Sequence, residues 1–228
     1  MPNLLIDADD TLWENNVYFE RALTDFISFL RHKQLSPVEV RDVINDVERE
    51  NVKLHGYGLK SFTRALITSF ERLSAEPITD AIHTTITGFA QRVARHPIEI
   101  MPGVSATLDY LSARHPLYLI TKGDGAEQRR KIELSGIADY FAAVEVLPEK
   151  SEETYRVLLD LKNFKPGETW MIGNSPKSDI NPSLAAGLNA VFIPHDNTWV
   201  LEHEELAAPA ANQILLRLRR FAELREHF

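Results

Sequence analysis

Side chains that could carry out acid–base, metal-binding or phosphate-binding chemistry follow four short apolar runs of the chain. Asp-Ala-Asp-Asp-Thr occupies positions 7–11, and Thr-Lys-Gly-Asp occupies positions 121–124. Glu149 and Lys150 follow the third run, and the fourth leads into Gly-Asn-Ser-Pro-Lys-Ser-Asp at 173–179. A single polar loop of this kind is usually a turn or a helix cap. Four such loops, each directly after an apolar run, indicate one shared site.

The apolar runs themselves are typical of strands buried on both faces of a parallel sheet. They span 4–6, 117–120, 143–147, 170–172 and 190–193. Segments with helical spacing lie between them at about 103–114, 125–136, 151–162 and 178–187. This alternation predicts an α/β fold with a Rossmann-like, three-layer core built on a parallel sheet. In such a sheet, ligands bind beyond the carboxyl ends of the strands, where the four polar loops fall.

One long interval, between the first and second apolar runs, breaks this alternation. Apolar residues recur there at helical spacing, for example Phe19 and Leu23. We therefore predict an inserted, all-helical domain of about four helices at 16–97. The core domain would then consist of 1–15 and 98–228.

The C-terminal stretch 212–228 is also expected to be a helix. The residues that would face the core are Leu215, Leu216, Leu218 and Phe221. Its arginines are interpreted as a solvated face, because the chain as a whole is acidic.

The composition excludes several classes of function. The 228 residues include 25 Lys and Arg against 33 Asp and Glu, a formal net charge of −8. A general nucleic-acid binder needs a positive surface, so no nucleic-acid partner is expected. The chain has no cysteine, which excludes disulfides and cysteine nucleophiles. No apolar run approaches the length of a membrane span, so we expect no membrane partner and a cytoplasmic location.

The order of the polar loops resembles the haloacid dehalogenase-like (HAD) hydrolase superfamily. The resemblance rests on Asp-x-Asp-x-Thr after the first strand, Thr121 after the second, Lys150 after the third, and Gly-Asn-Ser with the later Asp179 after the fourth. It covers the whole sheet domain, and the insert lies where this superfamily has its helical C1 cap. The first loop is particularly similar to pyrimidine 5′-nucleotidase-like members. The segments 57–62 and 173–179 are similar to uncharacterised HAD phosphatases.

The resemblance implies a phosphatase mechanism centred on the first loop. Asp7 would be the nucleophile that forms an aspartyl-phosphate, which splits one difficult step into two. Asp9 would be the general acid and base, protonating the leaving alkoxide and then activating water. Asp9 would therefore hold a proton while Asp7 is ionised, because two neighbouring carboxyl groups titrate apart.

The same resemblance implies where phosphate and substrate bind. Thr121 would donate a hydrogen bond to a phosphoryl oxygen, and Lys150 would neutralise the charge that the phosphate shares with Asp7. Other substrate-binding or phosphate-binding positions in the core would be Ala8, Thr11, Lys122 and Gly123. In the cap, Tyr57 and Lys60 belong to a glycine-rich loop that suits an anionic ligand, with a plain helix–helix turn as the alternative.

Mg²⁺ is the cofactor that the resemblance implies. Its ligands would be the Asp7 carboxylate, the Asp9 backbone carbonyl and the side chain at position 174, since hard cations take oxygen ligands. Position 174 is Asn where many relatives have Asp, so this ligand carries no formal charge. Weaker metal binding is expected unless Asp179 compensates, directly or through water.

We therefore predict a Mg²⁺-dependent phosphatase that acts on a small phosphorylated metabolite, either a nucleoside monophosphate or a sugar phosphate. Three alternatives stay open: a metal-independent 2-haloacid dehalogenase that uses Asp7, a sugar phosphomutase, and a non-catalytic binding module. Asp9 argues against the dehalogenase, which needs no second acid. Asn174 is the main support for the binding module. The sequence does not predict the oligomeric state.

Overall fold

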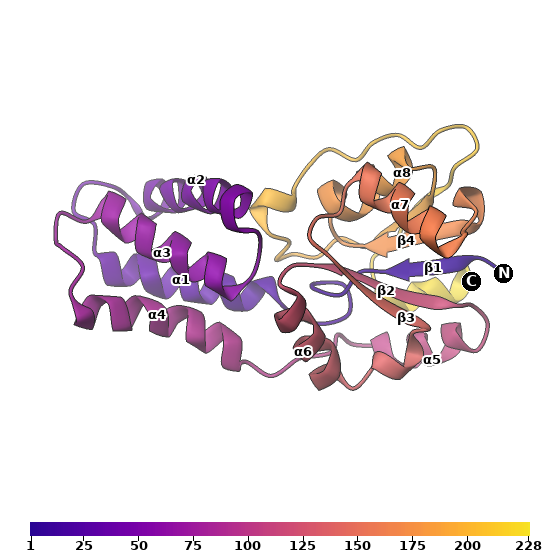
Figure 1. The fold of residues 1–228 in the computed structure, drawn as a ribbon, viewed down its shortest axis with the longest axis horizontal. Helices are drawn as coiled ribbons and strands as arrows, with labels where there is room; N and C mark the ends of the chain where they lie inside the picture. The colour runs from indigo at the N-terminus through magenta and orange to yellow at the C-terminus, as the bar shows by residue number, and fades with distance from the viewer. The chain divides into compact units, whose positions relative to one another are not determined.

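A computed structural model describes residues 1–228, and its centre is a six-stranded sheet in the order β3-β2-β1-β4-β5-β6 (Figure 1). Every neighbouring pair of strands is parallel. The strands are β1 (Asn3–Ile6), β2 (Leu117–Lys122), β3 (Ala143–Leu147), β4 (Thr169–Gly173), β5 (Asn189–Phe192) and β6 (Leu215–Arg217). The predicted α/β fold is confirmed, and β1, which leads into Asp7, lies in the middle of the sheet.

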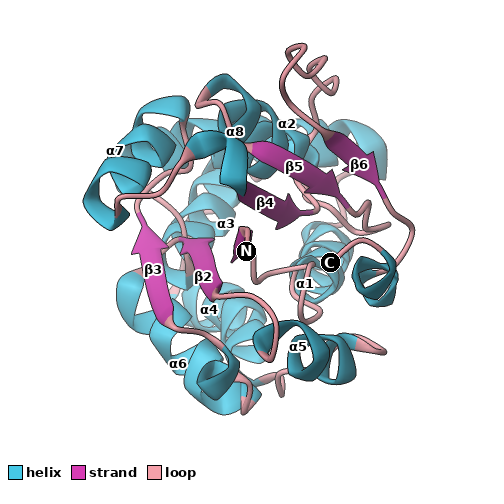
Figure 2. Cartoon of the chain, turned by 90° about the vertical axis from the view of Figure 1, so that its right-hand side faces the viewer, coloured by secondary structure: helices cyan, strands magenta, loops and turns pink.

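Helices cover both faces of this sheet (Figure 2). Successive side chains of a strand point to opposite faces, so Leu4 and Ile6 join one apolar cluster and Leu5 joins another. The first face is covered by α5 (Val104–Ser112), α6 (Gly125–Ser135) and the 3₁₀ helix η5 (Phe221–Glu226). The second face is covered by α7 (Glu152–Lys162) and α8 (Asn181–Ala185).

The prediction of a C-terminal helix was wrong. The chain instead forms β6 beside β5, and η5 follows it. Ala190 N donates to Ile214 O (2.9 Å), and Leu218 N donates to Phe192 O (3.0 Å). A short apolar run fits a helix or a strand equally well, and the unpaired backbone groups along the edge of β5 favour the strand.

The loop after β4 begins with an irregular turn. A π-helical turn, η3 (Pro176–Ile180), precedes α8, where one continuous helix was expected. Ser175 caps this turn, because its Oγ accepts a hydrogen bond from Ser178 N (2.9 Å). Shorter 3₁₀ helices lie at η1 (Ala138–Tyr140), η2 (Pro166–Glu168) and η4 (Val200–Glu202).

The chain divides into two compact units, Met1–Glu14 with Ile98–Phe228 and, separately, Asn15–Pro97. The second unit consists of α1 (Asn16–Leu30), α2 (Pro37–His55), α3 (Leu59–Leu73) and α4 (Asp80–Arg95). These helices share an apolar cluster of their own, which includes Phe26, Ile44, Leu66 and Ile86. No helix in either unit combines the length and the apolar character that a membrane span requires.

Within the sheet unit, a short antiparallel contact joins the segment before the insert to the segment after it. Trp13 forms an isolated bridge with Ile100, and Glu14 N donates to Glu99 O (3.0 Å). The Trp13 side chain is fully buried. The segment that follows the 7–11 loop is therefore held against the segment to which the chain returns.

Candidate active site

Asp7 follows β1 directly and lies in a buried cluster of charged side chains. Lys150 Nζ lies 2.5 Å from Asp7 Oδ1 and 2.7 Å from Asp179 Oδ1. The side chains of Lys150 and Asp179 are each 1% exposed. Three loops of the sheet therefore bring one cation and two carboxylates together, which leaves the cluster with an excess of negative charge.

This excess of charge changes the proton affinity of Asp7. Burial and the neighbouring Asp179 raise the pKa of Asp7 from 3.8 to about 7, although Lys150 acts in the opposite direction. Burial alone lowers the pKa of Lys150, but the two carboxylates raise it above its usual value. The lysine is thus charged, and it cannot by itself keep both carboxylates ionised at neutral pH.

The donor atoms around Asp7 fit a hard divalent cation. They are oxygens of Asp7, Asp179 and Asn174, and a cation would offset the negative charge that raises the Asp7 pKa. Thr11 joins two of them, because its Oγ1 lies 2.9 Å from Asp7 Oδ2 and 3.2 Å from Asn174 Oδ1. No protein nitrogen other than Lys150 competes for the Asp7 carboxylate in the contacts that the structure gives.

The 7–11 loop turns sharply after Asp7. Asp10 has a φ of 62°, in the left-handed region that Asp tolerates better than most residues. Thr11 N and Leu12 N both donate to Ala8 O, at 3.2 and 2.8 Å. This turn directs the Thr11 hydroxyl back to Asp7.

The loop after β4 needs a glycine at its start. A Cβ at Gly173 would collide with the Asp179 side chain. Asp179 Oδ2 also accepts a hydrogen bond from Ser175 N (2.9 Å), which fixes this carboxylate beside Lys150. Asn174 is 5% exposed, and its Nδ2 donates to Thr198 Oγ1 (2.9 Å).

Asp9 lies apart from the Asp7 cluster and has its own partners. Lys131 Nζ is 2.6 Å from both of its oxygens, Gln128 Nε2 donates to it (2.9 Å), and so does Trp13 Nε1 (2.7 Å). Burial alone would raise the pKa of Asp9, but Lys131 and these hydrogen bonds hold it below its usual value. Without a metal cation beside Asp7, the pKa of Asp7 is thus raised while that of Asp9 is lowered, because Asp9 has a lysine to itself, whereas Asp7 and Asp179 share one. The expected order with metal bound, Asp9 protonated and Asp7 ionised, stays a prediction.

The residues after β2 are divided between two environments. Thr121 is 1% exposed at the end of the strand, and Gly123 has a φ of 133°, which favours glycine. Lys122 Nζ lies 2.7 Å from both Ser178 Oγ and Glu202 Oε1. Lys122 is thus engaged by the loops after β4 and β5.

Glu202 was not found by sequence reasoning, nor were Gln128, Lys131 and Thr198. Glu202 also accepts hydrogen bonds from Ser175 Oγ (2.7 Å) and from Ser178 Oγ. Burial alone would raise the pKa of Glu202, but Lys122 and these donors lower it. The only local signal was the spacing of Gln128 and Lys131, three apart on one helix. The other two contacts join segments far apart in the sequence.

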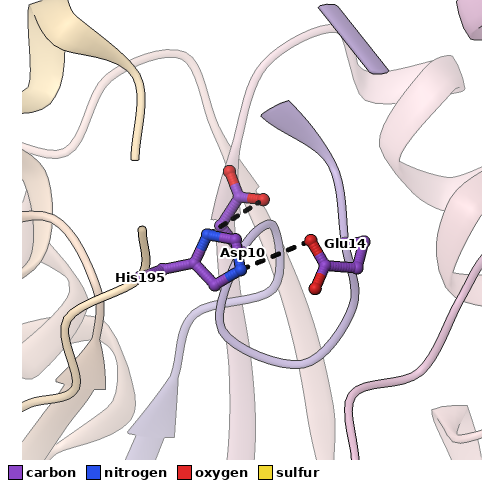
Figure 3. Close-up of side chains that lie close together, drawn as sticks. All are labelled: Asp10, Glu14 and His195. Carbon is purple, nitrogen blue, oxygen red and sulfur yellow. Dashed lines mark ion pairs between the residues drawn. The ribbon is translucent and has the colours of Figure 1, made fainter. Parts of the chain in front are cut away.

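A second group of ionisable side chains lies beside the 7–11 loop (Figure 3). His195 Nε2 is 3.3 Å from Glu14 Oε2, and His195 Nδ1 is 3.8 Å from Asp10 Oδ1. One ligand atom from each residue lies within 4.8 Å of the others, so the group could also hold a cation. The imidazole lies between the two carboxylates in Figure 3.

Tyr57 and Lys60 belong to the helical unit. Tyr57 lies in the turn between α2 and α3, where Gly56 and Gly58 have φ values of 71° and 109°, and Lys60 lies in the first turn of α3. Lys60 is exposed and Tyr57 is partly buried. The glycines account for the shape of this turn, while its contact with a substrate stays a prediction.

The family model for haloacid dehalogenase-like hydrolases matches residues 1–187 of this chain. The chain belongs to this family. The HAD resemblance of the motifs is thereby confirmed, and the protein is a hydrolase of that class.

Among curated proteins, this HAD hydrolase is similar to two mammalian enzymes. It is 28% identical to human N-acylneuraminate-9-phosphatase over 211 residues, which cover 85% of this chain and 82% of that protein. The rat N-acylneuraminate-9-phosphatase is 37% identical over 92 residues, covering 38% of this chain and 37% of the rat protein.

Solved structures agree with the HAD fold. A haloacid dehalogenase-like hydrolase from Xanthomonas campestris matches with a TM-score of 0.81 and 28% identity, covering 100% of this chain and 94% of that one. The HAD hydrolase YfnB from Bacillus subtilis, determined with bound magnesium, matches with a TM-score of 0.69 and 15% identity. The match covers 99% of this chain and 97% of the YfnB chain.

Proposed function

We propose that this HAD hydrolase is a Mg²⁺-dependent phosphatase that hydrolyses a small phosphomonoester through an aspartyl-phosphate on Asp7. The observation that carries the proposal is the buried group of Asp7, Lys150 and Asp179 at the carboxyl end of the central strand. Asp7 has only Lys150 as a cationic partner, and Asp179 uses the same lysine. The Asp7 carboxylate is therefore suited to bind a metal cation that also contacts a phosphate group.

Each core residue has a definite task in this proposal. An Asp7 carboxylate oxygen attacks phosphorus while the bond to the substrate oxygen breaks, and Lys150 balances the charge of the phosphate. The Thr121 hydroxyl donates to a phosphoryl oxygen, and Thr11 keeps the Asp7 carboxylate oriented. Mg²⁺, held by Asp7, the Asp9 carbonyl and Asn174 with support from Asp179, would lower the pKa of Asp7 and orient the phosphoryl group.

Asp9 has to exchange its present partners to act as acid and base. A protonated Asp9 carboxyl would give its proton to the leaving alkoxide and later take one from the water that attacks the aspartyl-phosphate. Its ion pair with Lys131 favours the ionised form. We therefore propose that Asp9 turns away from Lys131 when a phosphate approaches Asp7.

The relatives narrow the substrate class. N-acylneuraminate-9-phosphatases act on a phosphorylated sugar acid, as their name states. We propose a phosphorylated sugar or sugar acid as the substrate, with N-acylneuraminate 9-phosphate the first compound to test. The helical unit, as the cap, would select it, and Tyr57 and Lys60 are the positions proposed to contact its polar part.

The test is phosphate release from a panel of phosphomonoesters, measured with Mg²⁺ and with EDTA. The panel contains N-acylneuraminate 9-phosphate, hexose phosphates and nucleoside monophosphates, and the matched control is Asp7→Asn. Mg²⁺-dependent release that disappears in the control supports the proposal. Release that persists in Asp7→Asn refutes the nucleophile. Chloride release from 2-haloacids without metal would instead establish the dehalogenase.

A further inference from the structure

We infer that Thr198 is a positioning residue that turns the amide oxygen of Asn174 toward the Asp7 cluster, so that an asparagine can serve as a cation ligand there. This inference rests on the proposed function, in which Asn174 contributes to the Mg²⁺ site. Thr198 lies in the loop after β5, outside every motif that the sequence offered.

The hydrogen bonds of Thr198 decide how the Asn174 amide is oriented, because Thr11 has one hydroxyl hydrogen and can give it either to Asp7 Oδ2 or to Asn174 Oδ1. Thr198 Oγ1 lies 2.9 Å from His195 O, and a carbonyl oxygen can only accept. The single hydroxyl hydrogen of Thr198 is therefore used, and Thr198 Oγ1 can only accept from Asn174. The group of Asn174 that lies 2.9 Å from Thr198 Oγ1 is then its NH₂.

Because the amide nitrogen of Asn174 is held by Thr198, the direction of the amide oxygen is fixed as well. With its nitrogen held by Thr198, Asn174 directs Oδ1 to Thr11 Oγ1 (3.2 Å), which in turn contacts Asp7. An amide oxygen has lone pairs for a cation, whereas an amide NH₂ has none. A reversed amide would place two N–H donors where a metal ligand is needed. Asn174 is 5% exposed, so water has little access to stabilise the reversed form.

An aspartate at position 174 would not need a hydrogen-bond partner that fixes its orientation. Both carboxylate oxygens accept hydrogen bonds and both bind cations, so neither orientation is wrong. Thr198 could not donate to such a carboxylate and to His195 O at the same time. The hydroxyl at position 198 therefore suits an asparagine, and it accounts for a ligand of this type in a phosphatase site.

The test measures Mg²⁺ affinity in the full chain by isothermal titration calorimetry, with Mn²⁺ binding by electron paramagnetic resonance as a second readout. The variants are Thr198→Val, Thr198→Ser, Asn174→Asp and the Asn174→Asp/Thr198→Val double variant. Valine keeps the size of threonine, and the backbone bond from Thr198 N to His195 O (3.0 Å) is unaffected.

Thr198→Val should weaken Mg²⁺ binding about tenfold, as loss of a ligand-orienting partner does in other metal sites. Thr198→Ser, which keeps the hydroxyl, should stay within about twofold of wild type. In the Asn174→Asp background, the valine should change the affinity by less than about twofold, because no amide has to be oriented.

Two results would overturn the inference. One is wild-type Mg²⁺ affinity in Thr198→Val. The other is an equally large loss of Mg²⁺ affinity when Thr198→Val is introduced into the Asn174→Asp variant. That result would mean that the Thr198 hydroxyl supports the loop and does not orient the amide. If the wild type releases phosphate with Mg²⁺ but Thr198→Val binds Mg²⁺ normally, only this inference fails. If the wild type binds no Mg²⁺ at all, the proposed function fails with it.

Discussion

Replacing the buried Asp7 with asparagine should make the stability of the metal-free protein, relative to wild type, increase with pH. The folded protein holds the Asp7 proton with a pKa of about 7, whereas the ordinary value is 3.8. Because the folded state binds this proton more tightly than the unfolded chain, the stability of the metal-free protein falls as pH rises between these two values. Asp7→Asn has no such proton, so its stability lacks this fall.

The magnitude follows from the part of the titration that lies above pH 5. About two pH units separate pH 5 from the Asp7 pKa, which corresponds to roughly 3 kcal/mol in the free energy of unfolding. For a chain of this size, that is a shift of about 6–12 °C in Tm. Hydrogen bonds lost from Lys150 and Thr11 lower the stability of the variant at both pH values and therefore cancel in the difference.

The assay is thermal unfolding in EDTA at pH 5 and pH 8, for wild type, Asp7→Asn and the exposed control Asp160→Asn. The Tm of Asp7→Asn minus the Tm of wild type should be about 6–12 °C more positive at pH 8 than at pH 5. The corresponding difference for Asp160→Asn should be the same at both pH values. An Asp7→Asn difference that is the same at both pH values would refute the account of the buried charge.

Three further outcomes are expected. Mg²⁺ should raise the Tm of the wild type more at pH 8 than at pH 5, because cations compete with protons for Asp7, and equal shifts would contradict this. Lys131→Met should raise the pKa of Asp9 and move the basic limb of the pH–kcat/KM profile to higher pH, because Asp9 has to be protonated to act as the acid, whereas Lys131→Arg should keep the wild-type profile. Gly173→Ala should cost about 1–3 kcal/mol in urea unfolding and weaken Mg²⁺ binding by displacing Asp179, while Gly167→Ala, with open space around it, should change stability by less than about 0.5 kcal/mol.

The sheet was predictable because its signals are local. Strands buried on both faces are short continuous apolar runs, and the polar residue after each run marks the carboxyl edge. This reasoning brought Asp7, Lys150 and Asp179 to one edge, where the structure has them in contact. Their catalytic roles came from the resemblance and stay proposals.

The features that sequence reasoning missed depend on contacts between distant segments. β6 is a strand because β5 offers a free edge, and nothing in its own residues says so. The electrostatics of Asp9 depend on Lys131, more than a hundred positions away, and those of Lys122 depend on Glu202. A pKa order inferred from two neighbouring carboxyl groups alone omits such partners.

Because of the antiparallel contact at Trp13 and Ile100, the sheet can accept helical inserts of different length without a change in its own structure. The contact closes the chain into a loop whose two ends are fixed by Glu14 N donating to Glu99 O and Met101 N donating to Leu12 O, both at 3.0 Å. The entropy of closing such a loop grows only with the logarithm of its length, about 0.6 kcal/mol for each doubling. Helices grafted between these ends can therefore be lengthened, exchanged or reduced to a turn at little cost to the sheet, and the position of Asp7 at the end of β1 stays constant.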